Sequence, residues 1–456
     1  MLFGNIVIKG KGVGRMKDMI IYSGELLKAY ALQALSGINK ERDAVVALHK
    51  YITSPNDRKV CCLYGLLFTG KTTMMLQEIR KIADFGKCLL MKCGYDSTIM
   101  QLREAIEAHP EAQYIFVDQV TKVKDFISAG SVLANKYAAE GRKIVLSGDD
   151  SLTIFLAKGG ELYDRARLIH TTYIPFKEYN RLTGKGLTEY IKYGGTLSDD
   201  NVFRSIDTTN EYLNSAVVFN IVRSLEKWND RKYSALRKIS DSDLPSFISK
   251  VIENIGSDMP DTDPECVRAV IEYLNDIDFL YKLPTLGGRQ EYLFTQPGVM
   301  YARACEANFS DEQAVCGAVL EDIVLYQAAK ASENSDDIFV SRYGGVTGED
   351  TILYISNFSR KMSCVMAVEL YDNADTYLTD EAFCSGFERK SGTEISAKVV
   401  IYNGETKFTE QQVIYINAEE YLLHSDMLIK ALTENVISDN TSFCKAIRTA
   451  GIKLLS

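Results

Sequence analysis

The stretch Gly65-Leu-Leu-Phe-Thr-Gly70-Lys71-Thr72 decides the fold of this chain. It follows an apolar, β-prone run at Val60–Tyr64 and precedes a helical pattern that extends to Phe85. Glycines let the backbone turn tightly and direct its N–H groups at phosphate oxygens, and the start of a helix adds the positive end of its dipole. The pattern predicts a loop that binds the phosphates of a nucleoside triphosphate.

The residues of this loop have different expected roles. Lys71 can reach the β- and γ-phosphates, and the Thr72 hydroxyl can bind Mg²⁺. A chance glycine turn with a surface lysine is the alternative, but the β-run before it and the helix after it favour the phosphate loop. We therefore expect ATP with Mg²⁺ as the ligand. The predicted nucleotide-binding residues are Gly65, Phe68, Thr69, Gly70, Lys71, Thr72 and Thr73.

Strand and helix patterns alternate on both sides of the loop. Residues 87–92, 114–117 and 143–147 are strand-like, and helices are expected over 96–108 and 122–139. A leading helix over 38–51 is expected to pack on them. Such alternation predicts an α/β fold, a P-loop NTPase with a parallel sheet covered on both faces.

A magnesium site also needs a carboxylate outside the loop. Asp118 ends the predicted buried strand at 114–117, at the edge where ligands of open α/β sheets bind. Thr72 and Asp118 are therefore the predicted metal ligands, with a helix cap as the alternative role for Asp118. The strand and helix between these two residues indicate the P-loop class with an extra strand between the motif strands, which includes the AAA-type ATPases.

Gln119 departs from the usual pattern, in which a glutamate follows the aspartate and activates the attacking water. Glutamine can orient water but is a poor base, so slow hydrolysis, or ATP binding as a switch, becomes a serious hypothesis. At the end of the next strand, Ser147 or Ser151 could supply a polar contact to the γ-phosphate, and a plain turn explains them equally well. The predicted catalytic residues are Lys71, Asp118, Gln119 and Arg165.

Arg165 and Arg167 are candidates for an arginine that offsets negative charge on the γ-phosphate, either within the chain or from a neighbouring copy. Arg165 is the first choice and Arg167 the second. A solvated surface position is the alternative for each of them.

From Lys143 to Leu182 the chain resembles the prokaryotic AAA-type ATPases often labelled archaeal ATPase-like. In those proteins a sensor strand leads to an arginine and then to a Pro-x-x-Glu-Tyr/Phe-type segment, represented here by Pro175-Phe-Lys-Glu178-Tyr179. The stretches at 189–195 and 210–212 match the family's next module. The resemblance spans the chain from about residue 35 onward, and it implies a helical or winged-helix module after the ATPase domain.

Many members of that family end in a restriction-endonuclease-like domain, which the resemblance also implies here. Its metal site uses a helix glutamate, an aspartate and a Glu-x-Lys pair; Glu321 fits the first position. Thr351 stands at the aspartate position and Tyr371 at the lysine position after Glu369. Asp350 could shift in as a ligand, but nothing replaces the lysine. We expect a degenerate nuclease fold in which the two glutamates are surface or structural charges.

Composition sets the remaining limits. The chain has 456 residues, 46% apolar and 25% charged, with a net charge of -9, which argues against coating nucleic acid through bulk charge. Six basic residues between Arg223 and Lys238 could still form a local basic face, or a solvated helix face. Ten cysteines without a CxxC pair and four scattered histidines disfavour zinc. No signal peptide or membrane span is recognised, so cytoplasmic localisation without membrane contact is expected.

These observations predict four segments: 1–54 with the leading helix, 55–185 as the ATPase domain, 186–300 as the helical or winged-helix module, and 301–456 as the nuclease-like domain. The leading hypothesis is an ATPase that hydrolyses ATP slowly to switch its C-terminal modules. The alternative is an ATP-regulated DNA-binding or scaffold protein with little hydrolysis. DNA or a protein is a possible partner, and an oligomer is possible.

Overall fold

The structure is a computed structural model that describes residues 14–16, 18–149, 151–152, 156, 162–198, 202–227, 231–284, 290–306, 311–333, 335–344, 351–370 and 377–452. Of the residues discussed above, Asp350 and Tyr371 lie outside this set, as does the side chain of Thr351. Among the described residues, none of the helices is long and apolar enough to cross a membrane.

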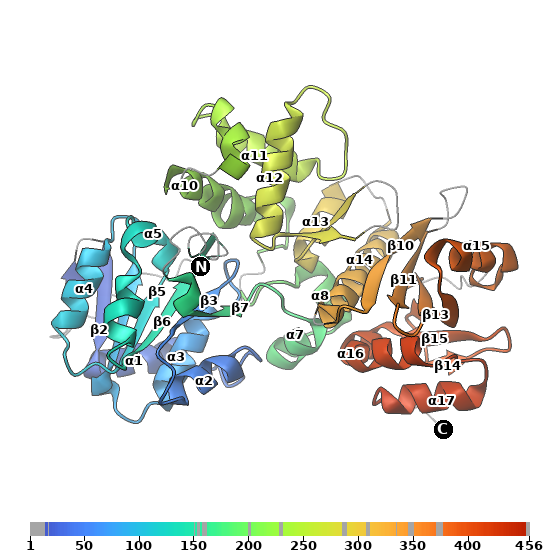
Figure 1. The fold of residues 1–456 in the computed structure, drawn as a ribbon, viewed down its shortest axis with the longest axis horizontal. Coiled ribbons are helices and arrows are strands. Elements are labelled where there is room, and N and C mark those ends of the chain that lie inside the picture. The colour runs from blue at the N-terminus through green and yellow to red at the C-terminus, as the bar shows by residue number, and fades with distance from the viewer. Residues whose placement is uncertain are drawn as a thin grey trace.

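The first sheet contains seven strands and fills the N-terminal part of the molecule (Figure 1). Its strands are β1 (Gly14–Met16), β2 (Met19–Ser23), β3 (Val60–Tyr64), β4 (Cys88–Cys93), β5 (Tyr114–Asp118), β6 (Lys143–Gly148) and β7 (Ala166–His170). Their order is β1-β2-β4-β5-β6-β3-β7, with β3 to β7 parallel and β1 and β2 antiparallel at one edge.

Helices cover both faces of this sheet, as the sequence predicted. One face carries α1 (Gly24–Ala34), α2 (Val45–Thr53) and α3 (Lys71–Lys81), which bury their apolar sides against Cys61, Leu63 and neighbouring strand residues. The other face carries α4 (Ile99–Glu107), α5 (Phe126–Ala129) and the π-helical segment η3 (Leu133–Ala138). Successive strand residues point to opposite faces, so a strand buried on both sides reads as a continuous apolar run.

Several local predictions need correction. The predicted helix over 122–139 is broken into η2 (Val120–Lys122), α5 and η3. The α4 helix begins at Ile99 and not at Asp96, the first residue of the expected helix, and it is capped by Thr98, whose side chain accepts a hydrogen bond from the Gln101 backbone. Within the expected leading helix over 38–51, Val45 and Leu48 are buried, but the side chain of Val46 is 74% exposed. Short 3₁₀ turns complete this part of the chain, η1 (Phe85–Lys87) and η4 (Tyr163–Arg165).

The strand order places β6 between the loop strand β3 and the aspartate strand β5. This arrangement confirms the predicted P-loop class, in which an extra strand separates the two motif strands. Because all five strands run in the same direction, the phosphate loop, Asp118 and Ser147 lie at one edge of the sheet.

The middle of the chain is mostly helical, as predicted; in Figure 1, α10, α11 and α12 lie above the first sheet, and α7 and α8 lie between the two sheets. It ends in a hairpin of two antiparallel strands followed by one helix. Its elements are α7 (Phe176–Thr183), α8 (Leu187–Tyr193), α9 (Ile206–Leu213), the π-helical η5 (Asn214–Val218), α10 (Phe219–Lys227), η6 (Arg231–Lys238), α11 (Leu244–Glu253), α12 (Pro264–Asp276), β8 (Leu280–Leu283), β9 (Glu291–Phe294) and α13 (Pro297–Glu306).

The C-terminal part is a second α/β unit with a six-stranded mixed sheet of order β10-β11-β12-β13-β15-β14. The strands β10, β11 and β12 are antiparallel neighbours, and β12, β13 and β15 are parallel. The elements are α14 (Glu312–Ser332), β10 (Ile338–Gly344), β11 (Thr351–Asn357), β12 (Met362–Val368), η7 (Tyr377–Thr379), α15 (Glu381–Ser391), β13 (Glu394–Tyr402), β14 (Lys407–Phe408), β15 (Val413–Asn417), α16 (Ala418–Glu434) and α17 (Asn440–Thr449).

The buried clusters cross the predicted domain boundaries. Strands β1 and β2, which precede residue 54, belong to the first sheet. One face of that sheet shares a core with α10, α11 and α12. Helices α7 and α8 bury Phe176, Tyr179 and Tyr190 in the same cluster as the second sheet. The parts are therefore packed together through the middle of the chain.

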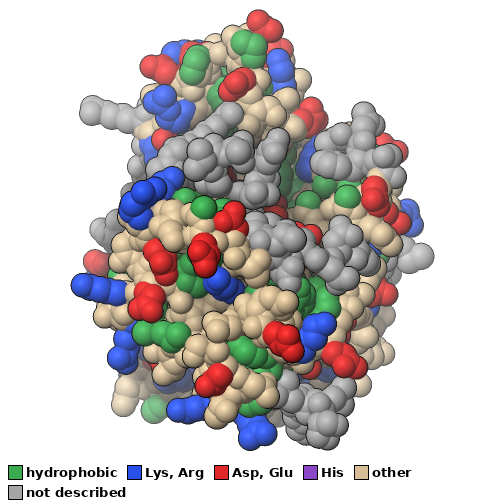
Figure 2. All heavy atoms as spheres, turned by 90° about the vertical axis from the view of Figure 1, so that its right-hand side faces the viewer, with side chains coloured by type: hydrophobic (Ala, Val, Ile, Leu, Met, Phe, Trp, Pro, Cys, Tyr) green, Lys and Arg blue, Asp and Glu red, His purple; other side chains and the backbone are tan. Residues whose placement is uncertain are grey.

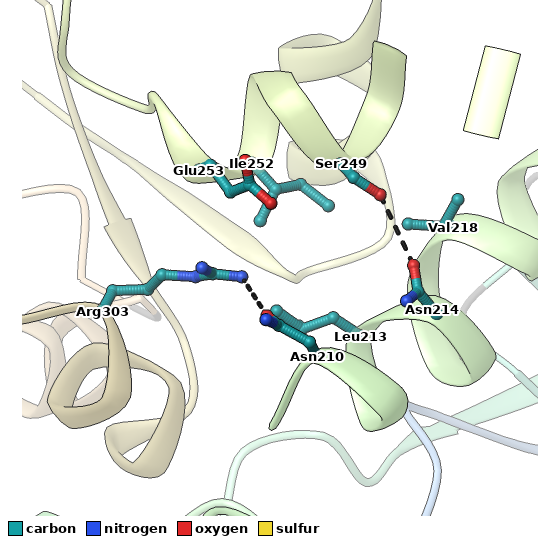
Figure 3. Close-up of a pocket in the computed structure, with 8 residues that line it drawn as sticks. All are labelled: Asn210, Leu213, Asn214, Val218, Ser249, Ile252, Glu253 and Arg303. Carbon is teal, nitrogen blue, oxygen red and sulfur yellow. Dashed lines mark hydrogen bonds between the residues drawn. The ribbon is translucent and has the colours of Figure 1, made fainter. Parts of the chain in front are cut away.

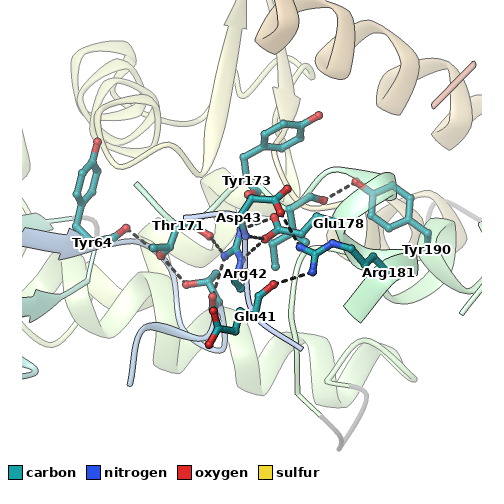
Figure 4. A network of polar contacts seen from close by, with 11 residues as sticks. Glu41, Arg42, Asp43, Tyr64, Thr171, Tyr173, Glu178, Arg181 and Tyr190 are labelled. Carbon is teal, nitrogen blue, oxygen red and sulfur yellow. Dashed lines mark hydrogen bonds and ion pairs between the residues drawn. The ribbon is translucent and has the colours of Figure 1, made fainter. Parts of the chain in front are cut away.

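A buried arginine holds these parts to the phosphate loop. Arg42 uses all five of its N–H groups: two go to the carboxylate of Glu178 in α7, at 3.0 and 2.9 Å, and three to backbone carbonyls. Those carbonyls belong to Thr69 in the loop and to Thr171 and Tyr173 after β7, as Figure 4 shows in part. The side chains of Arg42 and Glu178 are only 6% and 3% exposed.

We expect that Arg42→Ala lowers the stability of the protein strongly, by about 3–5 kcal/mol, because it leaves the Glu178 carboxylate buried without its partner. Arg42→Lys should also destabilise, since one ammonium cannot reach all the acceptors of a planar guanidinium. The measurement is the urea midpoint followed by circular dichroism. Arg181→Ala is the matched control: its ion pair with Asp43 is exposed, so the loss should stay below about 1 kcal/mol. Equal losses for Arg42→Ala and Arg181→Ala would contradict this assignment.

Candidate nucleotide-binding site

The two glycines of the loop are required by its geometry. Gly65 follows β3 with φ 154°, and a Cβ there would lie 2.2 Å from the Thr171 hydroxyl oxygen and 2.9 Å from the Thr172 nitrogen. Gly70 has φ 87° and immediately precedes α3. Both positions favour glycine because L-residues with a side chain rarely adopt such angles. The loop therefore closes tightly against the end of β7.

Lys71 folds back over the loop. Its Nζ donates hydrogen bonds to the carbonyl oxygens of Gly65 and Leu66 at 2.6 and 2.7 Å. These bonds hold the ammonium inside the curve of the loop, next to the first turn of α3. Phosphate oxygens are stronger acceptors for an ammonium than carbonyls are, so a bound phosphate would replace these bonds favourably.

The other predicted loop residues fall into two groups. Thr69 is buried and its hydroxyl contacts the Thr171 hydroxyl at 2.8 Å, which gives it a role in holding the loop. Phe68 has a positive φ of 63° and a 42% exposed side chain whose ring centroid lies 6.2 Å from that of Tyr212 in α9. Thr73 lies in the first turn of α3. Phe68 therefore connects the loop to the helical region.

Thr72, Asp118 and Ser147 meet at the carboxyl edge of the sheet. The Thr72 hydroxyl lies 3.1 Å from both carboxylate oxygens of Asp118, and the Ser147 hydroxyl donates to one of them. A hydroxyl and a carboxylate are hard oxygen donors that suit Mg²⁺. No group of three or more His, Cys, Asp or Glu side chains among the described residues could hold a metal alone. An ion here would therefore depend on phosphate oxygens and water as well, as Mg²⁺ commonly does.

Gln119 turns the chain away from β5. It adopts the left-handed conformation, φ 62° and ψ 45°, and its backbone N–H donates to the Ser147 hydroxyl at 3.1 Å. A non-glycine residue in this region is uncommon and is held by its surroundings. The position thus offers a neutral amide next to the Asp118 carboxylate, without a base.

Two residues that the sequence did not single out lie at the same edge. Asp149 follows β6 and accepts hydrogen bonds from Thr121 and the Ser151 backbone. Burial raises the pKa of its carboxyl, and the hydrogen bonds and the charge of Lys71 partly oppose this rise. Burial lowers the pKa of Lys122, partly offset by Asp118 and Asp149. In the sequence, both residues were marked only by their position shortly after a strand. Many ordinary turn residues share that position, so it did not single them out.

The structure separates the two serines that were candidates for a phosphate contact. Ser147 is bonded to Asp118 at the site. Ser151 instead lies 3.2 Å from the Tyr273 hydroxyl and accepts a hydrogen bond from Ser224 of α10 at 3.1 Å. Ser147 therefore belongs to the candidate site, and Ser151 joins the sheet to the helical region.

Arg165 and Arg167 lie at the opposite edge of the sheet. Strand pairing aligns Val60 with Ala166 and Tyr64 with His170, so both arginines are at the amino end of β7. The loop is a full strand away, about 17 Å. Arg165 bonds to Asn135 and Arg167 to Asp57. Neither reaches the loop of its own chain, so a γ-phosphate contact by Arg165 would require a neighbouring copy.

Of the four basic residues between Arg223 and Lys238 whose side chains the structure describes, three are paired with carboxylates, and Arg237 is exposed. Arg223 pairs with Glu226, Lys232 with Asp276, and Lys238 with Asp263 and Glu265. The side chains of Lys227 and Arg231 lie outside the described set. Arg223 also lies over the Tyr95 and Phe219 rings, at 5.5 and 5.1 Å from their centroids. These contacts favour the structural interpretation of the run over a nucleic-acid face.

The loop, the strand order and the Thr72–Asp118 pair define a P-loop NTPase fold with the strand arrangement of AAA-type ATPases. No family model matches the chain, and no curated protein matches it.

Solved structures align with it weakly. A chain of the S. cerevisiae Hsp104–ADP complex aligns over 68% of this chain and 47% of its own length, with 12% identity and a TM-score of 0.28. This chain thus spans about half the length of that one. C. elegans PCH-2 aligns over 55% and 69%, with 13% identity and a TM-score of 0.21. A chain from Drosophila ORC bound to GC-rich DNA and Cdc6 aligns over 59% and 92%, with 14% identity and a TM-score of 0.23. Because these scores are low, the fold assignment rests on the strand order.

We expect Lys71→Ala to abolish ATP binding, because it removes the cation at the centre of the loop. Thr72→Ala should keep some ATP affinity but lose the gain in affinity that Mg²⁺ gives. Calorimetric titration of ATP with Mg²⁺ and with EDTA measures both effects. Lys50→Ala, an exposed lysine in α2, is the matched control and should bind as the wild type does. Unchanged affinity in Lys71→Ala would show that the loop is not the nucleotide site.

Proposed function

We propose that this protein binds ATP–Mg²⁺ at the phosphate loop, hydrolyses it slowly and uses the cycle to switch its C-terminal parts. The observation that carries the proposal is the convergence of Lys71, Thr72 and Asp118 at one sheet edge, with the Thr72 hydroxyl 3.1 Å from the carboxylate. Lys71 holds the β- and γ-phosphates, and Thr72 and Asp118 hold the metal. Bound Mg²⁺ would neutralise charge that develops on the phosphates.

Slow turnover follows from the residues beside Asp118. Gln119 can accept and donate hydrogen bonds to a water molecule but cannot take its proton near neutral pH. Asp149 is the nearby carboxyl that could do so, and its raised pKa brings it closer to a useful base. It is, however, engaged by Thr121 and the Ser151 backbone. The site therefore favours holding ATP over cleaving it quickly.

Switching is supported by two routes from the site to the rest of the chain. Through Arg42, the Thr69 carbonyl in the loop is tied to Glu178 in α7, whose neighbours Phe176 and Tyr179 lie in the core of the second sheet. On the other side, Lys122 at the site edge lies over the Tyr95 ring, 4.8 Å from its centroid, and Tyr95 packs edge-on against Phe219 of α10, with ring centroids 5.4 Å apart. A change in the loop on phosphate binding would act on the Arg42 contacts, and a change at the Lys122 edge would act on the Tyr95–Phe219 contact.

The finer module assignments are proposals too. The order α11, α12 and then the β8–β9 hairpin matches that of a winged helix. In such a module α12 would face DNA, yet it carries Glu265, Glu272 and Asp276 against Arg268 alone. This acidic helix favours a protein partner over DNA. We therefore rank regulation by DNA second among the candidate functions.

We also propose that the C-terminal unit is a degenerate nuclease fold. Its order of α14, three antiparallel strands, α15 and a parallel β13 supports the resemblance. Glu321, the candidate metal ligand, bonds to Arg342 at 3.0 Å, and Arg342 also binds Asp322 and Glu291. An arginine on the carboxylate opposes a cation there. Among the described residues on the face of this unit seen in Figure 2, acidic and basic side chains are interspersed without a continuous basic surface.

We predict that Gln119→Glu raises the rate of ATP hydrolysis at least tenfold, because it adds the missing base beside Asp118. Steady-state phosphate release measures it. Gln113→Glu is the matched control: it makes the same change at the other end of β5, where the side chain is exposed, and should leave the rate unchanged. Asp149→Asn tests the other carboxyl and should abolish residual turnover if Asp149 is the base. A fast wild type that Gln119→Glu slows would contradict this account.

We predict that the protein does not cut nucleic acid. Pure protein is incubated with plasmid, single-stranded DNA and RNA, with Mg²⁺ or Mn²⁺, and with or without ATP. Carboxylates and lysine of such a site act as a unit, and the unit fails when members are replaced. Cleavage that is lost in Glu369→Ala but kept in Glu410→Ala, an exposed loop glutamate, would overturn the prediction.

A further inference from the structure

A cavity of about 130 Å³ lies in the helical region, away from the phosphate loop (Figure 3). It is lined by the end of α9, the π-helical segment η5, α11 and α13, which contribute both charged and apolar side chains. π-helical turns are rare and occur often at functional sites, because they displace side chains from regular helical positions. The segment η5 contributes Asn214 and Val218 to this cavity.

Arg303 of α13 enters the cavity from one side (Figure 3). Its side chain is only 13% exposed, and it bonds to the Asn210 side chain at 3.0 Å and to Glu306. Its Nε is buried and has no hydrogen-bond partner. A guanidinium has five N–H groups, so these contacts leave donors unused, and an unused buried donor costs free energy. The arginine is thus poised to take a further acceptor such as a carboxylate.

Glu253 of α11 faces the same cavity and carries the opposite charge. It has no hydrogen bond or ion pair with any described residue, and it does not pair with Arg303. Ser249, one turn earlier on α11, and Asn214 add polar groups at its side of the cavity, 3.4 Å from one another. Glu253 and Arg303 carry opposite charges and line one space without bonding to each other, although Arg303 also bonds to Glu306, and this pair of charges suits a ligand that carries both.

The rest of the lining is apolar and the space is small. Leu213, Val218 and Ile252 are 3%, 3% and 2% exposed and form the inner wall. A volume of about 130 Å³ equals the share of roughly four water molecules and lies below the ~300 Å³ at which drug-sized sites begin. The ligand therefore has few heavy atoms and an apolar part.

We propose that this cavity binds a small zwitterion with one carboxylate and one ammonium group, and that a free α-amino acid with a small apolar side chain fits it. The carboxylate bonds to Arg303, the ammonium bonds to Glu253 and Ser249, and the side chain packs on Leu213 and Ile252. This binding site goes beyond nucleotide binding and does not depend on it. Since η5 continues directly into α10, the ligand would bind next to a helix that contacts the nucleotide edge of the first sheet.

The test is calorimetric titration of the full chain with each of the twenty standard amino acids, with acetate and methylammonium as ligands that carry one charge each. We expect at least one small apolar amino acid to bind, and the single-charge ligands to bind at least tenfold more weakly. Arg303→Gln and Glu253→Gln should each weaken the binding tenfold or more, because each removes a charge-assisted hydrogen bond. Lys250→Gln, an exposed change on α11 outside the cavity lining, is the matched control and should bind normally.

ATP affinity and the thermal midpoint are measured for every variant, so that loss of the fold is distinguished from loss of the site. Glu253 is exposed and unpaired, so Glu253→Gln keeps the proposal testable even if Arg303→Gln does not fold. The proposal is overturned if no amino acid binds at millimolar concentrations, or if Glu253→Gln binds it as well as the wild type does. Acetate binding as tightly as the amino acid would also overturn it, since the cavity would then be an anion site.

Discussion

Arg42 joins three separate parts of the chain through one buried side chain. It bonds to the loop at Thr69, to the segment after β7, and to Glu178 in α7. A charge removed from water is tolerable only when it is paired and its donors are satisfied, and both conditions hold here because all five N–H groups are used. The same requirement makes the arrangement rigid: no part can move away without leaving a charge or a carbonyl buried and unpaired.

The candidate site is assembled at a point that this network fixes. Gly65 allows the loop to pack within van der Waals distance of Thr171, one of the residues whose carbonyl Arg42 holds. The loop is thereby placed opposite the end of β5, where Asp118 meets the Thr72 hydroxyl. The parallel direction of the strands brings these groups together, since it gathers their carboxyl ends at one edge. Preorganised donors and charges of this kind act without a large rearrangement when phosphate arrives.

The same contacts explain why the parts of the chain are not independent. Helix α7 carries Glu178 toward the loop and buries Phe176 and Tyr179 in the cluster under the second sheet. The first sheet in turn shares a core with the helical region. Burial of this extent makes relative motion of the parts costly, so a change at the loop has a physical path to the C-terminal unit.

What the sequence determined by itself is local. The glycine spacing, the strand and helix on either side of it and the end of β5 at Asp118 depend on residues close together in the chain, and the strand order they indicated is present. Tertiary structure alone decided the rest. The partners Arg42 and Glu178 lie 136 positions apart in the chain. Arg165 lies at the end of the sheet opposite the loop, because β7 runs parallel to β3 and Arg165 precedes the first residue of β7. Such pairings depend on how strands order and helices pack, and spacing along one sequence does not specify which distant side chains meet.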